Sequence, residues 1–71
     1  MAQMTRMQRA DMIRLERLRL RLHQEEVAAK AECNQATVSK AEQGRGSDEV
    51  YDAIERALAE LAATPSKTEA R

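Results

Sequence analysis

The chain has 71 residues, and its 12 basic and 12 acidic side chains leave a formal net charge of zero. One aromatic residue, one proline and two glycines argue against a β-sandwich, which needs many turns and packing aromatics. One cysteine and one histidine cannot make a four-ligand zinc site or a disulfide framework, so we expect neither a metal nor a cofactor. The 42% hydrophobic and 34% charged residues favour a small all-α protein of four to five helices that needs a partner subunit.

The charges are unevenly distributed along the chain. Residues 1–22 hold six arginines and two acids, whereas residues 23–49 hold three basic and six acidic side chains. A polyanion is therefore expected to bind only through a local face. The longest uncharged run has seven residues, too few to span a membrane, and no apolar signal-peptide core follows Met1. We expect a cytoplasmic protein that does not contact a membrane.

Two interpretations are open for the start of the chain. Residues 1–11 lack a strong helix cap, so they either extend the first helix or form an N-terminal arm. In an arm, Arg6 and Arg9 could enter the minor groove of DNA, whereas in a helix they would be solvated charges. The strict Arg-Leu alternation of residues 17–22 resembles a strand, but no second strand is predicted to pair with it. We predict a helix over residues 12–22, because leucine and arginine are strong helix formers.

The first helix carries apolar side chains on two sides. At 100° per residue, one face holds Met4, Met7, Leu15, Leu18 and Leu22. Ile13 and Leu20 point almost the opposite way. The leucines of the first face are expected in the core, and the second side then suggests a protein interface.

A short turn separates the next two predicted helices. The first of them covers residues 23–31. Asn34 offers an N-cap oxygen for the second, which is expected over residues 35–43. Gly44 follows at the position where a left-handed C-cap is easiest, so the second helix should end there.

The fourth predicted helix has the clearest amphipathic pattern. Ser47 or Asp48 can cap it. Its apolar residues follow the helical spacing and are Val50, Ala53, Ile54, Ala57, Leu58 and Leu61. Residues 12–63 are therefore expected to form one domain, followed by a disordered tail over residues 64–71.

The two short middle helices carry the functional signal. The turn between them is too brief for antiparallel packing, so the helices must cross steeply. Ala28 is small where they would cross, and Cys33 and Val38 would lock the second helix against the first. The open side of the second helix holds Gln35, Ala36, Thr37, Ser39 and Lys40. Such side chains can bond base edges without introducing repelling carboxylates.

This segment resembles the phage Cro- and repressor-like helix-turn-helix family. The family's Gln-Glu-Glu-apolar-Ala run is matched by residues 24–28. Its second-helix pattern is matched by residues 34–42, followed by Gln43, Gly44 and Arg45. The separation of the two blocks agrees without a gap, and the resemblance covers residues 12–62. It implies a lambda-repressor-like fold whose second helix of the pair enters the major groove of double-stranded DNA.

The resemblance also implies a role for each matched residue. Gln24 would bind a DNA phosphate and support Gln35, and Glu42 would pair with Arg17 or Arg14 of the first helix. The expected DNA contacts are His23, Gln24, Gln35, Ala36, Thr37, Ser39, Lys40 and Arg45. The expected structural residues are Arg17, Ala28, Cys33, Val38, Glu42 and Gly44.

The chain departs from the family pattern at four positions. His23 stands where the helix cap is usually serine or threonine, and Glu32 stands where the turn usually has glycine. A non-glycine residue in the left-handed conformation costs on the order of 1 kcal/mol. Ala41 replaces a bulky core residue, so the first helix is expected to fill the space. Glu16 falls where an apolar residue is expected.

The resulting prediction is a DNA-binding transcriptional regulator, a repressor that binds a near-palindromic operator as a homodimer. One recognition helix reads too few base pairs, and a twofold axis places two of them about 34 Å apart, one turn of DNA. Dimer contacts are expected from the side of the first helix with Ile13 and Leu20. The other candidate is the fourth helix around Tyr51, Ile54 and Leu58.

The composition bears on two other classes of function. The alternative is a protein-binding helical module that keeps the fold, such as an antitoxin or an anti-activator, since the net charge is zero and the first helix is apolar on two sides. The small size favours a phage or another mobile element as the setting. An enzyme is not expected, because His23 and Cys33 have no third residue to orient them and no glycine-rich phosphate loop is present. We expect Cys33 to be a small core side chain rather than a redox sensor.

Overall fold

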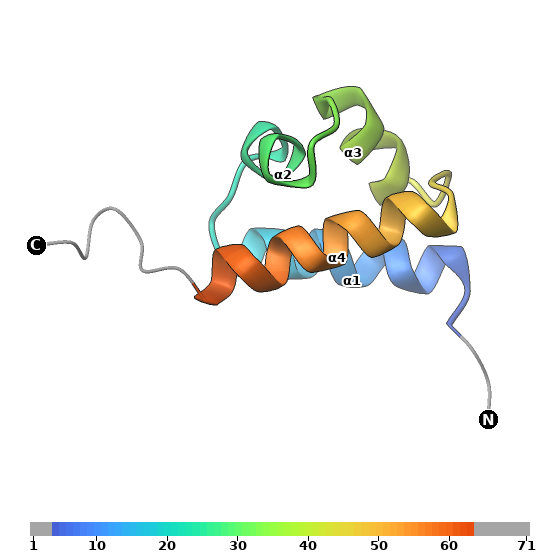
Figure 1. The fold of residues 1–71 in the computed structure, drawn as a ribbon. Coiled ribbons are helices and arrows are strands. Elements are labelled where there is room, and N and C mark those ends of the chain that lie inside the picture. The colour runs from blue at the N-terminus through green and yellow to red at the C-terminus, as the bar shows by residue number, and fades with distance from the viewer. Residues whose placement is uncertain (1–3, 64–71) are drawn as a thin grey trace, which may run out of the picture.

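The computed structural model describes residues 4–63, which form four helices and no strand (Figure 1). The helices are α1 (Arg6–Arg19), α2 (Gln24–Ala31), α3 (Gln35–Glu42) and α4 (Asp48–Ala63). The predicted all-α class is therefore confirmed, and α2, α3 and α4 lie within a residue or two of the predicted ranges. The tail expected to be disordered, residues 64–71, lies outside the described residues. No helix among residues 4–63 is both long and apolar enough to cross a membrane.

The four helices form two layers. In Figure 1, α1 and α4 run side by side in the same direction, and α2 and α3 lie across them. The axis of α2 points toward the viewer while α3 runs in the plane of the picture, so the two cross steeply as predicted. The pair α2–α3 therefore connects the end of α1 to the start of α4 at the opposite end of the lower layer.

The start of α1 is fixed by a cap that the sequence interpretation missed. The Oγ1 of Thr5 accepts a hydrogen bond from the backbone N–H of Gln8 at 3.0 Å, and the Oε1 of Gln8 accepts one from the N–H of Thr5 at 2.8 Å. This reciprocal pair is a capping box, which Thr-x-x-Gln can supply. Residues 6–11 therefore extend the first helix, and a DNA-binding arm is excluded for them.

The C-terminal end of α1 is also well defined. Leu20 caps the helix, and Arg21 adopts a left-handed conformation with a φ of 60°. The Arg-Leu alternation of residues 17–22 thus crosses a helix terminus. It does not mark a strand.

The buried side of α1 is the reverse of the one predicted. Ala10 and Ile13 are 0% and 2% exposed, and Leu20 packs against the same core. Leu15 and Leu18, expected inside, are 59% and 50% exposed. Ala10 and Ile13 lie in the core where α1 contacts α3 and α4. The predicted dimer interface at Ile13 and Leu20 is therefore wrong.

The other predicted dimer contacts are also core residues. Tyr51, Ile54 and Leu58 are at most 3% exposed. The hydroxyl of Tyr51 donates to the backbone oxygen of Ala41 at 2.7 Å, which satisfies both buried groups. A Cβ added at Gly46 would lie 3.1 Å from the Cβ of Ala41 and 3.2 Å from the Cε2 of Tyr51. The space beside Ala41 is thus shared: Gly46 and Tyr51 pack against it, and Ala10 and Ile13 of α1 belong to the same core.

Arg9 ties the N-terminal parts of α1 and α4 together. Its guanidinium lies 2.7 Å from Asp52, 3.0 Å from Glu55 and 3.7 Å from Asp48, and 5.2 Å above the ring centroid of Tyr51. The hydrogen bonds that Arg9 donates to Glu55 and Asp52 raise its pKa, so it stays charged. Arg9 is therefore a structural residue and is committed to α4. Its predicted alternatives, solvated charge and minor-groove contact, are both wrong.

Glu16, which stood at an expected apolar position, is accommodated at the surface. Its carboxylate accepts two hydrogen bonds from Arg19, at 2.5 and 3.1 Å, one turn along α1. These bonds lower the pKa of Glu16 and raise that of Arg19. The register of α1 is therefore retained without burying the carboxylate.

Candidate nucleic-acid interface

The turn between α2 and α3 determines how the two helices lie relative to each other. Glu32 ends α2 with a φ of 62° and a ψ of 43°, so the position that usually holds glycine is left-handed as predicted. The N–H of Cys33 then returns to the backbone oxygen of Ala28 at 2.9 Å. Asn34 caps α3, because its Oδ1 accepts from the N–H of Thr37 at 2.9 Å and from its hydroxyl at 2.7 Å. The turn is thus held by local hydrogen bonds at both ends.

The left-handed Glu32 leads to a stability prediction. Glu32→Gly should raise the free energy of unfolding by about 0.5–1 kcal/mol, because glycine adopts this conformation without the Cβ penalty that glutamate meets. Glu32→Ala is the matched control, since it removes the carboxylate but keeps the Cβ. Chemical denaturation followed by circular dichroism measures both. An equal gain in the two variants would mean that charge, and not backbone conformation, is responsible.

Small apolar side chains hold α3 against α2, as predicted. Ala28 and Val38 are 3% and 0% exposed, and Cys33 is half-buried against the same core. Gly44 has a φ of 87°, which confirms the expected left-handed end of α3. The side chain of Met7 covers Gly44 so closely that a Cβ there would overlap its sulfur atom.

The partial burial of Cys33 predicts how the reactivity of its thiol depends on pH. Burial raises the pKa of the Cys33 thiol, so less thiolate is present at a given pH than in the unfolded chain. A thiol-specific disulfide reagent should therefore react several-fold more slowly with the native protein near pH 8 than with the denatured protein. The native rate should continue to rise above the ordinary thiol pKa, about 8.5. Equal rates in both states would contradict the burial.

A chain of polar contacts runs from α1 to the start of α3. Arg17 donates to both carboxylate oxygens of Glu42, at 2.6 and 3.0 Å, and to the backbone oxygen of Leu22 at 2.9 Å. The Nε2 of Gln24 donates to Glu42 Oε1 at 3.1 Å, and the Nε2 of Gln35 donates to Gln24 Oε1 at 3.0 Å. The expected pairing of Glu42 with Arg17 and the support of Gln35 by Gln24 are both confirmed. We call these four side chains the Arg17–Gln35 relay.

The relay has a fixed direction. A carboxylate can only accept, so Glu42 requires Gln24 to turn its amide nitrogen inward. The amide oxygen of Gln24 then faces outward and requires the nitrogen of Gln35. Gln35 is left with one amide N–H and its amide oxygen for an external partner. The buried charges thereby determine which groups are presented at the surface.

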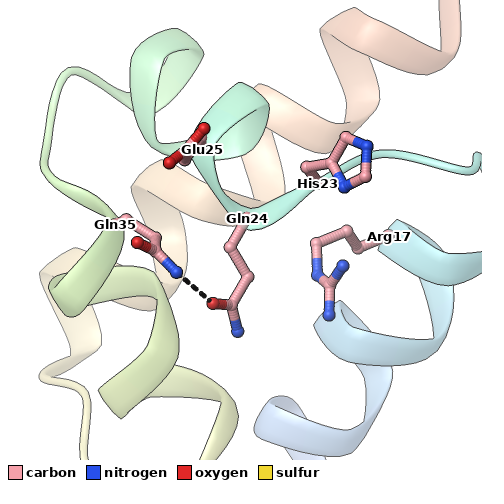
Figure 2. A pocket seen from close by; sticks show the side chains of 5 residues that line it. All are labelled: Arg17, His23, Gln24, Glu25 and Gln35. Atoms are coloured by element: carbon pink, nitrogen blue, oxygen red, sulfur yellow. Dashed lines mark hydrogen bonds between the residues drawn. The ribbon is translucent and has the colours of Figure 1, made fainter.

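The relay opens into a shallow hollow of about 500 Å³, lined by Arg17, His23, Gln24, Glu25 and Gln35 (Figure 2). Figure 2 shows the hollow between α1, α2 and the start of α3, with α4 behind them. The structure therefore brings His23, Gln24 and Gln35 together, as the sequence predicted. Glu25 was missed as a lining residue, because its place in the first turn of α2 indicated only a favourable helix terminus.

The other predicted contact residues lie along α3 and just beyond it. Ala36 and Lys40 are exposed, whereas Thr37 and Ser39 are half-buried. Thr37 is engaged in the cap of Asn34, and the Oγ of Ser39 accepts a hydrogen bond from Gln43 at 3.3 Å. The exposed Arg45 donates to the side chain of Gln43. Lys40 and Arg45 are thus placed past the hollow, toward the end of α3.

The electrostatics of this surface depend on one buried acid. Glu42 is the only carboxylate of α3, and its side chain is 6% exposed and paired with Arg17. The exposed side of α3 consequently carries the positive charge of Lys40 and no negative charge. Glu25 is the one acidic side chain among the residues that line the hollow.

His23 begins α2 without capping it through its side chain. Its backbone N–H donates to the Oε1 of Glu26 at 2.7 Å, and its imidazole lines the hollow. The imidazole therefore faces the surface on which Gln24 and Gln35 present their amides.

Among residues 4–63, no cluster of three or more histidine, cysteine, aspartate or glutamate side chains could hold a metal ion.

Comparisons with known proteins do not extend this description. No protein-family model matches the chain, and neither a curated protein nor a solved structure matches it.

Proposed function

We propose that this chain is a sequence-specific DNA-binding regulator of the Cro- and repressor-like helix-turn-helix class, and that it represses transcription as a homodimer on a near-palindromic operator. The observation that carries the proposal is the Arg17–Gln35 relay. Its hydrogen bond from Gln35 to Gln24 orients the Gln35 amide at the exposed start of α3, and the relay buries the only carboxylate of that helix. A pre-positioned amide on a helix without repelling charge suits a base edge in the major groove.

The surrounding residues fit two kinds of DNA contact. Gln35 and Ala36 would enter the major groove, where the methyl group of Ala36 suits a thymine methyl. His23, Lys40 and Arg45 lie on both sides of this point, where DNA phosphates would pass. The half-buried Thr37 and Ser39 would serve the groove contact mainly by fixing the start and the middle of α3.

The fixed direction of the relay also predicts a base preference. The free N–H and the free oxygen of Gln35 form an adjacent donor and acceptor, which matches N7 and the N6 amino group of adenine. We therefore expect an adenine opposite Gln35 in each half of the operator. Gln35→Glu replaces the donor by a second acceptor and should shift the preference at that position toward cytosine.

The experiment that tests the function is a selection of bound duplexes from a random pool, with the purified protein at about physiological salt. An inverted repeat with half-sites about one DNA turn apart, bound less tightly as salt rises, is the expected result. A pool that shows no enrichment after several rounds would refute sequence-specific binding.

A second candidate function is supported by one observation, the exposed apolar side of α1. A module that binds another protein would use such a surface and would tolerate the zero net charge of the chain. It would copurify with a stable partner, and its binding to random DNA would be weak and insensitive to salt.

A further inference from the structure

The outward side of α1 is an uncovered apolar surface. The large hydrophobic side chains that are exposed among residues 4–63 are Met4, Met7, Met12, Leu15 and Leu18, at 46–59% exposure. We call these five residues the α1 stripe. Most of them lie on the face of α1 opposite Ile13, which is buried. Apolar patches of more than a few hundred Å² on a small protein mark sites of protein association.

We propose that the α1 stripe is the interface of a homodimer, in which the α1 helices of two copies pack antiparallel. The proposal deepens the DNA-binding function and rests on it for the way in which the two copies face one duplex. It replaces the two dimer faces predicted from the sequence, since Ile13, Tyr51, Ile54 and Leu58 are all buried.

The charges beside the stripe favour a second copy of the same chain. Asp11 lies within the stripe and Arg14 at its edge, both are exposed, and neither forms an ion pair among residues 4–63. In an antiparallel register centred between Met12 and Ile13, Asp11 of each copy faces Arg14 of the other. The same register places Leu18 of one copy beside Met7 of the other, which is 55% exposed although its sulfur covers Gly44 of its own chain.

Other arrangements of the two helices bring like charges together. A parallel pair would set Asp11 against Asp11 and Arg14 against Arg14. An antiparallel pair centred on Asp11 itself would also oppose the two aspartates. Like charges directly opposed across such an interface disfavour it, so the charges select one register.

The location of the stripe leaves the DNA-facing surface free. In Figure 2, α1 lies to one side of α2 and α3 around the hollow, and α4 lies behind. Two copies joined through α1 can therefore stand side by side with both hollows facing the same way. Packed helices are about 8–10 Å apart, so the path from α3 through both α1 helices to the second α3 covers about 24–30 Å. This is close to the ~34 Å between half-sites one DNA turn apart.

Sedimentation equilibrium of the full chain tests the interface without DNA. The wild type should be a dimer, and the double substitution Leu15→Glu, Leu18→Glu should make it monomeric. The double substitution Ala59→Glu, Ala62→Glu, which places the same two charges on the exposed side of α4, is the matched control and should stay dimeric. Unchanged helical circular dichroism would show that the monomeric variant is folded.

A charge swap tests the register. Asp11→Arg and Arg14→Asp should each weaken the dimer by roughly tenfold, and the two together should restore it. Failure of the double variant to recover would overturn the antiparallel register. A wild type that is monomeric over the accessible concentration range would overturn the interface, and would leave a different protein as the occupant of the stripe.

The dimer and the DNA-binding function can fail separately. The monomeric Leu15→Glu, Leu18→Glu variant should still bind a duplex with one half-site, with the base preference of the wild type. Loss of binding to the full operator together with retained binding to the half-site would support both proposals. A dimeric wild type that binds no DNA would refute the function while upholding the interface.

Discussion

Glu42→Ala is expected to lower the free energy of unfolding by about 2–3 kcal/mol, because it leaves the largely buried guanidinium of Arg17 without its acid partner. The Arg17 side chain is 13% exposed, and Glu42 accepts hydrogen bonds from both Arg17 and Gln24. A domain of this size has a total stability of only about 3–5 kcal/mol, so the variant should be close to unfolding. Thermal denaturation should show a fall in the midpoint temperature of roughly 10–20 °C.

The exposed ion pair between Glu16 and Arg19 on α1 supplies the control. Glu16→Ala removes the partner of Arg19, whose side chain is 65% exposed. Water solvates the freed arginine, so the stability should be almost unchanged. If Glu42→Ala were as mild as Glu16→Ala, the buried pair would not stabilise the fold. A double replacement of Arg17 and Glu42 by methionine and leucine should recover much of the loss, since no charge is left unpaired.

Gln35→Ala is expected to lower the affinity for the selected operator by roughly 10–100-fold, the value of one bidentate base contact. Binding to a scrambled duplex at the same salt concentration should be unchanged, since Gln35 would contact a base and not a phosphate. Fluorescence anisotropy with the two duplexes measures both values. Gln24→Ala should have a smaller effect at the same base position, because it removes the support of Gln35 but not the base contact itself.

Lys40→Ala provides the contrasting result. The exposed Lys40 would contact a phosphate, so its loss should weaken binding to both duplexes and reduce the salt slope by about one. If Gln35→Ala bound the operator as tightly as the wild type, the assignment of Gln35 to the groove would be wrong. An unchanged circular dichroism spectrum of each variant would show that its loss of DNA binding is not due to unfolding.

The parts of the fold that were predictable are those that depend on neighbours in the sequence. The cap at Asn34, the left-handed positions at Glu32 and Gly44, and the apolar spacing of α4 all arise within a few residues of one another. The Arg17–Glu42 pair was an exception, because it spans 25 residues and was expected only from the resemblance.

The orientation of α1 could not be predicted in this way. Both of its sides are apolar, and the alternation of leucine with arginine offers no local reason to bury one of them. The choice depends on distant partners: Arg9 reaches Asp52 on α4, 43 residues away, and Arg17 reaches Glu42 on α3. These two contacts orient α1 so that Ala10 and Ile13 lie in the core.

The site residues also divide into those that follow from nearby sequence and those that depend on distant contacts. The amide at Gln35 and the support from Gln24 follow from the helix positions of the matched segment. The burial of Tyr51 could not be predicted in this way. Its phenol requires the backbone oxygen of Ala41 as a partner, and the sequence alone does not place that oxygen beside α4.

The shared direction of α1 and α4 has a consequence for engineering. In an antiparallel α1 dimer, the end of α4 in one copy would lie at the same end of the assembly as the start of α1 in the other. A linker of about a dozen residues, which reaches up to about 40 Å when extended, could then join the end of α4 in one copy to the start of α1 in the other. A head-to-tail fusion of two copies would thus give a single-chain dimer, in which each half could carry a different residue at Gln35 and read an asymmetric operator.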